Sequence, residues 1–72
     1  MYALIVDDSK PVRSILTKVL NRLQFQCVEA SNGIEALDRL SHMPRPSLIT
    51  LNRHMPEMDG FEFLSRMRQE ER

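Results

Sequence analysis

The sequence has 72 residues, of which 42% are hydrophobic and 28% are charged, and its ten basic and ten acidic side chains give a formal net charge of zero. This length allows one domain at most, and the balanced charge argues against a nucleic-acid-binding module, which normally carries a basic stripe. A single cysteine cannot form an internal disulfide, and no apolar stretch is long enough to cross a membrane.

The first predicted element is a strand over residues 2–6, a continuous apolar run that ends at Asp7 and Asp8. Such a run is typical of a strand that is buried on both faces of a parallel sheet. Because the two acids interrupt the run after five residues, the N-terminus does not match a secretion signal. We therefore expect a cytoplasmic protein.

A helix is predicted next, with Ser9 as its N-cap and Pro11 in its first turn. Its apolar residues recur with helical spacing: Val12, Ile15, Leu16, Val19, Leu20 and Leu23. All of these except Leu23 are expected to be committed to the core. The basic residues off that stripe are expected in solvent: Lys10, Arg13, Lys18 and Arg22.

Residues 25–30 are rich in strand formers and predict a short edge strand, in which Cys27 is expected to be packed rather than reactive. Asn32 and Glu35 then have the spacing of a capping box, which predicts the start of a second helix. The apolar face of that helix is expected to consist of Ile34, Leu37 and Leu40.

A third strand is predicted over residues 48–51, followed by a third helix with Asp59 as its cap. The apolar face of this helix is expected to consist of Phe61, Leu64 and Met67. Three strand–helix repeats predict an α/β protein with a parallel sheet. If the third strand lies beside the first, the strand order is 2-1-3, and Asp7, Asp8 and Asn52 meet at the switch point where ligands bind.

Adjacent carboxylates such as Asp7 and Asp8 repel each other and are tolerated when they are exposed or when a cation neutralises them. Mg²⁺ takes about six oxygen ligands, several of them from water, so Asp8, a side chain of the third strand and a backbone carbonyl would make a sparse site. The alternative is that residues 7–9 are only a polar turn. His54 is expected to be an exposed loop histidine, because imidazole does not suit an oxygen-lined Mg²⁺ site.

The run LITLNRHMPEMDG, from Leu48 to Gly60, resembles the phosphoacceptor loop of response-regulator receiver domains. That loop has an apolar strand, Asp, two residues, Met-Pro, two residues and Asp-Gly, and the acceptor Asp is here Asn52. The resemblance implies a flavodoxin-like fold, two-component phosphorelay signalling and a sensor histidine kinase as partner. Residues 1–72 match three of the family's five strand–helix units, so a partial receiver domain is expected; the Ser/Thr and Lys that close strands 4 and 5 lie beyond Arg72 in the family pattern.

The resemblance also implies a Mg²⁺ site. Asp8 and the acceptor position, Asn52, would bind the ion directly, Asp7 through water, and His54 through its backbone carbonyl. The covalent step of a receiver needs an ionised oxygen nucleophile, which an amide lacks. We therefore expect a signalling module, not an enzyme, that is not phosphorylated at Asn52 and binds Mg²⁺ weakly.

Two alternatives follow from the same residues. One is a pseudo-receiver that serves as a phosphate-independent interaction module. The other is a phosphotransfer protein in which Asp7 or Asp8 replaces the usual acceptor.

The third strand is also expected to be an edge strand that is apolar on both faces. Such edges recruit other chains, and two-fold symmetry is the usual outcome. We therefore predict a homodimer with residues 48–51, or the face of the third helix, at its interface.

Overall fold

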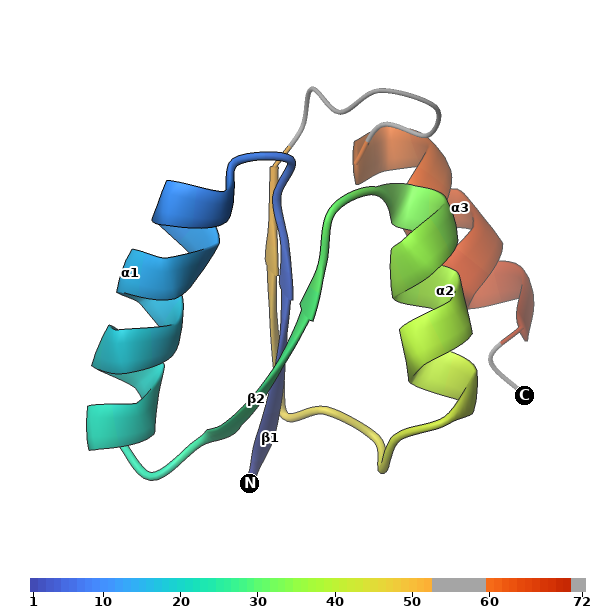
Figure 1. Cartoon of the computed structure of the whole chain (residues 1–72). Helices are drawn as coiled ribbons and strands as arrows, with labels where there is room; N and C mark the ends of the chain where they lie inside the picture. Colours follow the sequence, from blue (N-terminus) through green and yellow to red (C-terminus); the bar gives the residue numbers. More distant parts are fainter. Residues whose placement is uncertain (53–59, 71–72) are drawn as a thin grey trace.

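The computed structural model describes residues 1–52 and 60–70, which form a parallel sheet with α1 on one face and α2 and α3 on the other (Figure 1). In chain order the elements are β1 (Tyr2–Val6), α1 (Lys10–Arg22), β2 (Gln26–Ala30), α2 (Gly33–Ser41), β3 (Leu48–Leu51) and α3 (Gly60–Glu70). The predicted strand order is confirmed, because β1 lies between β2 and β3.

Strand β1 forms the centre of the molecule. Its Leu4 lies opposite Val28 of β2 and opposite Ile49 of β3, and both pairings are parallel. Because successive side chains of a strand point to opposite faces, β1 contributes to a core on each side of the sheet. From Ala3 to Val6 the exposed fractions are 0–1%, which confirms that this strand is buried on both faces.

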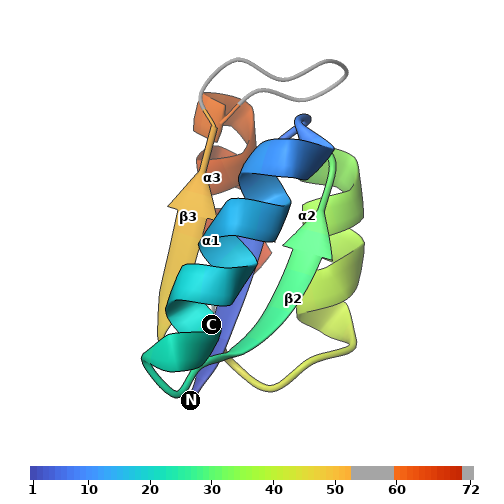
Figure 2. The same cartoon turned by 60° about the vertical axis from the view of Figure 1, so that its left-hand side comes forward.

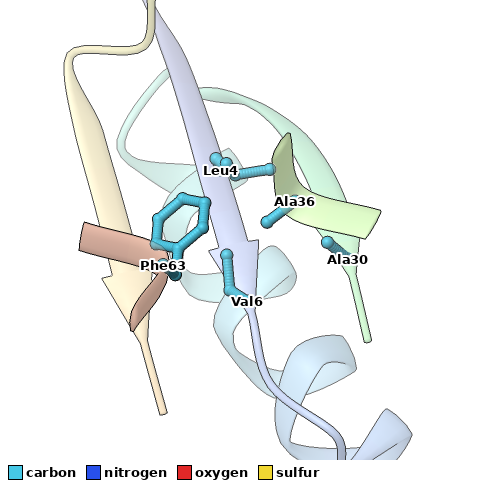
Figure 3. Close-up of a cluster of buried hydrophobic side chains, with 5 residues drawn as sticks. All are labelled: Leu4, Val6, Ala30, Ala36 and Phe63. Carbon is cyan, nitrogen blue, oxygen red and sulfur yellow. The ribbon is translucent and has the colours of Figure 1, made fainter. Parts of the chain in front are cut away.

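The larger core lies between the sheet and the helix pair α2 and α3. Its buried members are Leu4, Val6, Ala30, Ala36 and Phe63. Figure 3 shows the ring of Phe63 lying over β1, next to Leu4 and Val6. Burying a phenyl ring removes a large apolar area from water, so this one side chain ties α3 to the centre of the sheet.

The predicted apolar face of α3 was wrong at Leu64, which is 40% exposed, whereas Phe63 is fully buried. Phe63 and Met67 are four residues apart and form a helical stripe of their own; Met67 packs against the same core. Helical spacing alone does not choose between the two stripes, and the bulkier aromatic residue is the one that is buried. The side chain of Phe61 and the predicted cap Asp59 lie outside the described residues.

The smaller core lies under α1, where Ala3, Ile5 and Leu20 are buried and Leu16 packs against them. The prediction that the apolar stripe of α1 is committed to the core was wrong for three of its five residues, which are 40–62% exposed: Val12, Ile15 and Val19. A single helix meets a sheet along a narrow line, and no second helix in the described part of the chain lies on this face. A similar error applies to Ile34 of α2, which is 51% exposed.

The predicted helix starts are confirmed where the structure describes them. The hydroxyl of Ser9 accepts a hydrogen bond from the N–H of Val12 at 3.4 Å, and Asn32 Oδ1 accepts one from the N–H of Glu35 at 2.8 Å. Glu35 Oε1 in turn accepts from the N–H of Ser31 at 2.8 Å, one residue before the expected donor. Within the described ranges, no helix is long and apolar enough to span a membrane.

Candidate functional site

The candidate site lies where β1 and β3 end, at the upper edge of the sheet in Figure 2. Asp7 and Asp8 follow β1 directly, and Asn52 follows β3. Two backbone bonds fix these chain ends: the N–H of Asn52 donates to Val6 O at 2.9 Å, and the N–H of Asp7 donates to Ala30 O at 3.1 Å. The strand order thus brings residues from three separate strand ends to one place.

The side chains at this edge are in contact, as the strand order predicted. Asn52 Nδ2 donates a hydrogen bond to Asp8 Oδ1 at 3.0 Å, although the two residues are 44 positions apart in the sequence. Asp7 Oδ1 accepts a hydrogen bond from the N–H of Ser9 at 2.8 Å. The amide of Asn52 therefore gives Asp8 a hydrogen-bond donor at the position where a third carboxylate would repel it. His54 lies outside the described residues.

An open pocket of about 370 Å³ adjoins these polar groups. It is lined by Val6, Asp7, Asp8, Ser9, Val12, Leu16, Thr50, Leu51 and Asn52. The hydroxyl oxygen of Thr50 is buried and has no hydrogen-bond partner among the described groups. An unpaired buried hydroxyl costs about 1–3 kcal/mol, so the pocket wall carries one hydrogen-bonding group whose capacity is unused.

Arg13 also belongs to this site, although its place there was not predicted from the sequence. It was expected in solvent, but its side chain is only 14% exposed, and its Nε donates to Glu29 Oε1 at 3.0 Å. Its Nη1 donates to the backbone oxygen of Asp7 at 2.6 Å. The signal that could have revealed it is Glu29, the one charged residue of β2, because a half-buried charge needs a partner.

The oxygen donors at the strand ends suit a hard cation, but only weakly. Asp7 and Asp8 supply carboxylates and Asn52 supplies an amide oxygen, so water would have to provide most of the ligands of a Mg²⁺ ion. The described residues hold no cluster of three His, Cys, Asp or Glu side chains, because the third member of this group is an amide. The amide N–H already faces Asp8, so Asn52 must turn its oxygen inward before it can bind a cation.

Cys27 lies apart from these groups, partly buried beneath α1. Burial raises the pKa of its thiol, and the negative charge of Glu29 raises the pKa further. The reactive form of a cysteine is the thiolate. A raised pKa therefore favours the packed, unreactive thiol that was expected from the sequence.

The family model described as response regulator receiver domain matches residues 3–72. The chain therefore belongs to the response-regulator receiver family, and it is a receiver domain of a two-component system similar to the chemotaxis regulators. Among curated relatives it is 43% identical over 65 residues to sporulation initiation phosphotransferase F of Bacillus subtilis, with 90% of this chain and 52% of that protein covered. It is 38% identical to chemotaxis protein CheY of Listeria monocytogenes, with 89% and 54% covered. The chain thus spans about half the length of these relatives.

Solved structures agree on the fold. The N-terminal domain of a response regulator receiver protein from Methanoculleus marisnigri matches with a TM-score of 0.90 and 33% identity over 97% of this chain and 56% of that one. The response regulator TrrA from Thermotoga maritima, solved in complex with Mg²⁺-BeF, matches with a TM-score of 0.88 and 28% identity over 97% and 60%. The expected flavodoxin-like architecture with strand order 2-1-3 is therefore confirmed.

Proposed function

We propose that this chain is a receiver module in which Asn52 occupies the phosphoacceptor position, so that no acyl phosphate forms there. The observation that supports this most directly is the hydrogen bond of 3.0 Å between Asn52 Nδ2 and Asp8 Oδ1 at the ends of β3 and β1. This contact joins residue 52 to Asp8, which supports the proposal that residue 52 corresponds to the acceptor of the receiver motif. An amide in that position has no ionisable oxygen with which to attack phosphorus.

The residues of the site then have distinct roles. Asp8 and Asp7 supply the negative charge that would hold a divalent cation, and the backbone carbonyl of His54 is the further ligand that the motif suggests. When bound, Mg²⁺ would neutralise these acids and draw charge from phosphoryl oxygens. Asn52 instead donates its N–H to Asp8 and so satisfies one carboxylate oxygen without a metal.

Incubation with a small phosphodonor and Mg²⁺ should leave the intact mass of the chain unchanged, because residue 52 is an amide. The Asn52→Asp variant should gain Mg²⁺ affinity by adding a charged oxygen ligand. Mass spectrometry with peptide mapping measures how much phosphate each of the two proteins gains and at which residue. Strong labelling of the unmodified chain at Asp7 or Asp8 would instead establish the alternative phosphotransfer function.

The same substitution should make the stability of the chain depend on Mg²⁺. In Asn52→Asp a carboxylate replaces the donor that lies 3.0 Å from Asp8, and two like charges at that range cost about 1 kcal/mol in a solvated setting. We expect a lower melting temperature in chelator that Mg²⁺ restores by binding the folded state. Asn52→Ala, which loses the hydrogen bond without adding charge, is the control and should not respond to Mg²⁺. Equal responses of the two variants would contradict the proposed cation site.

A second candidate is a phosphate-independent interaction module, and the exposure of the α1 stripe favours it. Ile15 and Val19 are 62% and 49% exposed on one side of this helix. Receiver domains interact with sensor histidine kinases, and an apolar helix face of this kind suits such a protein partner. Capture of a sensor histidine kinase that persists without phosphodonor or Mg²⁺, and that Ile15→Lys abolishes, would support this function.

We also infer that the chain forms a homodimer. In the described sheet β3 has β1 on one side only, and all four of its residues are partly exposed. Unpaired strand edges with apolar side chains favour association. The supporting argument is thus the open edge of β3.

A further inference from the structure

Arg13 connects three elements next to the acidic pair. It lies in the first turns of α1, and its guanidinium donates to the Asp7 carbonyl after β1 and to Glu29 of β2. Glu29 is held in turn by Thr17, whose hydroxyl donates to Glu29 Oε2 at 3.2 Å. Hydrogen bonds from a charged donor are stronger than neutral ones, and the rigid guanidinium fork fixes two acceptors at once.

These bonds fix the backbone from which Asp8 projects. The carbonyl of Asp7 belongs to the peptide group that joins Asp7 to Asp8, so a donor at 2.6 Å from this oxygen restrains the rotation of that peptide plane. The N–H of Asp7 is held independently by Ala30 O at 3.1 Å. Both backbone groups of Asp7 are therefore fixed, and with them the position of the Asp8 Cα from which its side chain projects.

We propose that Arg13 is a positioning residue of the acidic site: anchored by Glu29, it orients the Asp7–Asp8 peptide so that the Asp8 carboxylate meets residue 52. The metal-binding consequence of this inference rests on the proposed cation site. Arg13 does not bind the ion. It keeps the Asp8 carboxylate within reach of the side chain of residue 52. At that separation the two side chains can form a hydrogen bond with each other or bind one divalent cation together.

If Arg13 acted only through its charge, its effect on the affinity for Mg²⁺ would be the opposite of the effect proposed here. A positive charge near two carboxylates opposes cation binding, so a residue that acted only through its charge would lower the affinity for Mg²⁺. Arg13→Lys separates the two roles, because lysine keeps the charge and loses the planar fork. Arg22→Lys is the matched control, since Arg22 is exposed near the end of the same helix.

The first experiment needs no metal. In the ¹⁵N–¹H spectrum of the otherwise unmodified chain, the side-chain NH₂ resonances of Asn52 report on its hydrogen bond to Asp8. Arg13→Lys should move them to the positions of a free, solvated amide while the rest of the spectrum stays dispersed, and Arg22→Lys should leave them in place. Unchanged Asn52 resonances in a folded Arg13→Lys protein would overturn the inference.

The second experiment uses the Asn52→Asp background and follows the Asp8 amide during a Mg²⁺ titration. Arg13→Lys should weaken the affinity about tenfold, which is the lower end of what the loss of an outer-shell partner costs at a metal site; Arg22→Lys should leave it unchanged. Equal affinity in Arg13→Lys and its parent would overturn the positioning role toward a cation. An Asn52→Asp parent that binds no Mg²⁺ would rule out the proposed cation site. The positioning role would still stand if Arg13→Lys frees the Asn52 amide in the first experiment.

Glu29→Gln covers the case in which Arg13→Lys does not fold. The glutamine carbonyl still accepts from the Nε of Arg13, but this hydrogen bond loses the charge of its acceptor and holds Arg13 less firmly. We expect changes in the same direction in both experiments but of smaller size. A folded Glu29→Gln protein with an unchanged Asn52 amide would contradict the anchoring role of Glu29 and thus overturn the inference.

Discussion

Replacing Phe63 by alanine is expected to unfold the chain. Phe63 has an exposed fraction of 0% and is one of the largest fully buried side chains of the described core. Truncation of a buried Phe to Ala costs about 3–5 kcal/mol, and a single core in a protein of about this length rarely supplies more than ~3–5 kcal/mol in total. The measurement is urea unfolding followed by circular dichroism, in which the variant should show no cooperative transition.

Leu64→Ala is the matched control for Phe63→Ala. It makes a change to alanine at the next position of α3, but Leu64 is 40% exposed. Both changes to alanine raise the helix propensity of α3 slightly, so the difference in stability between the two variants measures burial. A Phe63→Ala protein that unfolds cooperatively and as late as Leu64→Ala would show that α3 does not pack as described.

The second large effect concerns assembly. At micromolar concentration the chain is expected to sediment at about twice its monomer mass. In the described part of the chain, β3 has no partner strand on its outer edge, and such edges favour association. The exposed stripe of α1, which was expected to be buried, adds apolar surface on one face of the same sheet. Two-fold pairing of such surfaces is self-complementary and closes at a dimer. A well-folded monomer across this concentration range would contradict the prediction.

Charged substitutions locate the interface. Ile49→Lys places a charge in β3, where Ile49 packs against the larger core, and should dissociate or unfold the protein. Ile15→Lys places the same charge on the α1 stripe, where 62% exposure allows the monomer to stay folded. Ile34→Lys is the control, since Ile34 is 51% exposed on α2, on the other face of the sheet. Dissociation by Ile15→Lys but not by Ile34→Lys would place the α1 stripe in the interface.

Local signals in the sequence predicted the elements and their order well. The caps at Ser9 and Asn32 depend on residues three positions away, so the sequence displays them directly. Burial was predicted less well, because an apolar stripe shows which residues share a side of a helix and not how wide its contact with the sheet is. This is why Ile15 was expected in the core and is exposed.

The candidate site likewise has features that the sequence predicted and features that it did not. The convergence of Asp8 and Asn52 follows from the strand order alone, and the structure shows their contact. The role of Arg13 was not visible, because its partner Glu29 is 16 residues away and becomes a neighbour only when α1 packs on β2. The hydroxyl of Thr50, which has no partner among the described groups, was equally hidden, since only packing shows that its oxygen is buried.

The position of β3 determines the order in which the site opens. Native proteins open in cooperative units, and units with few partners exchange their amide hydrogens first. In the described sheet β3 is held by β1 alone, whereas β1 has a partner strand on each side. The amide of Asn52, bonded to Val6 O, should therefore exchange faster than that of Ile5 in a hydrogen–deuterium experiment, and equal rates would mean that the sheet opens as one unit. The acidic pair thus follows the better-protected strand β1 and residue 52 follows the less protected strand β3, so the site can come apart while its scaffold stays folded.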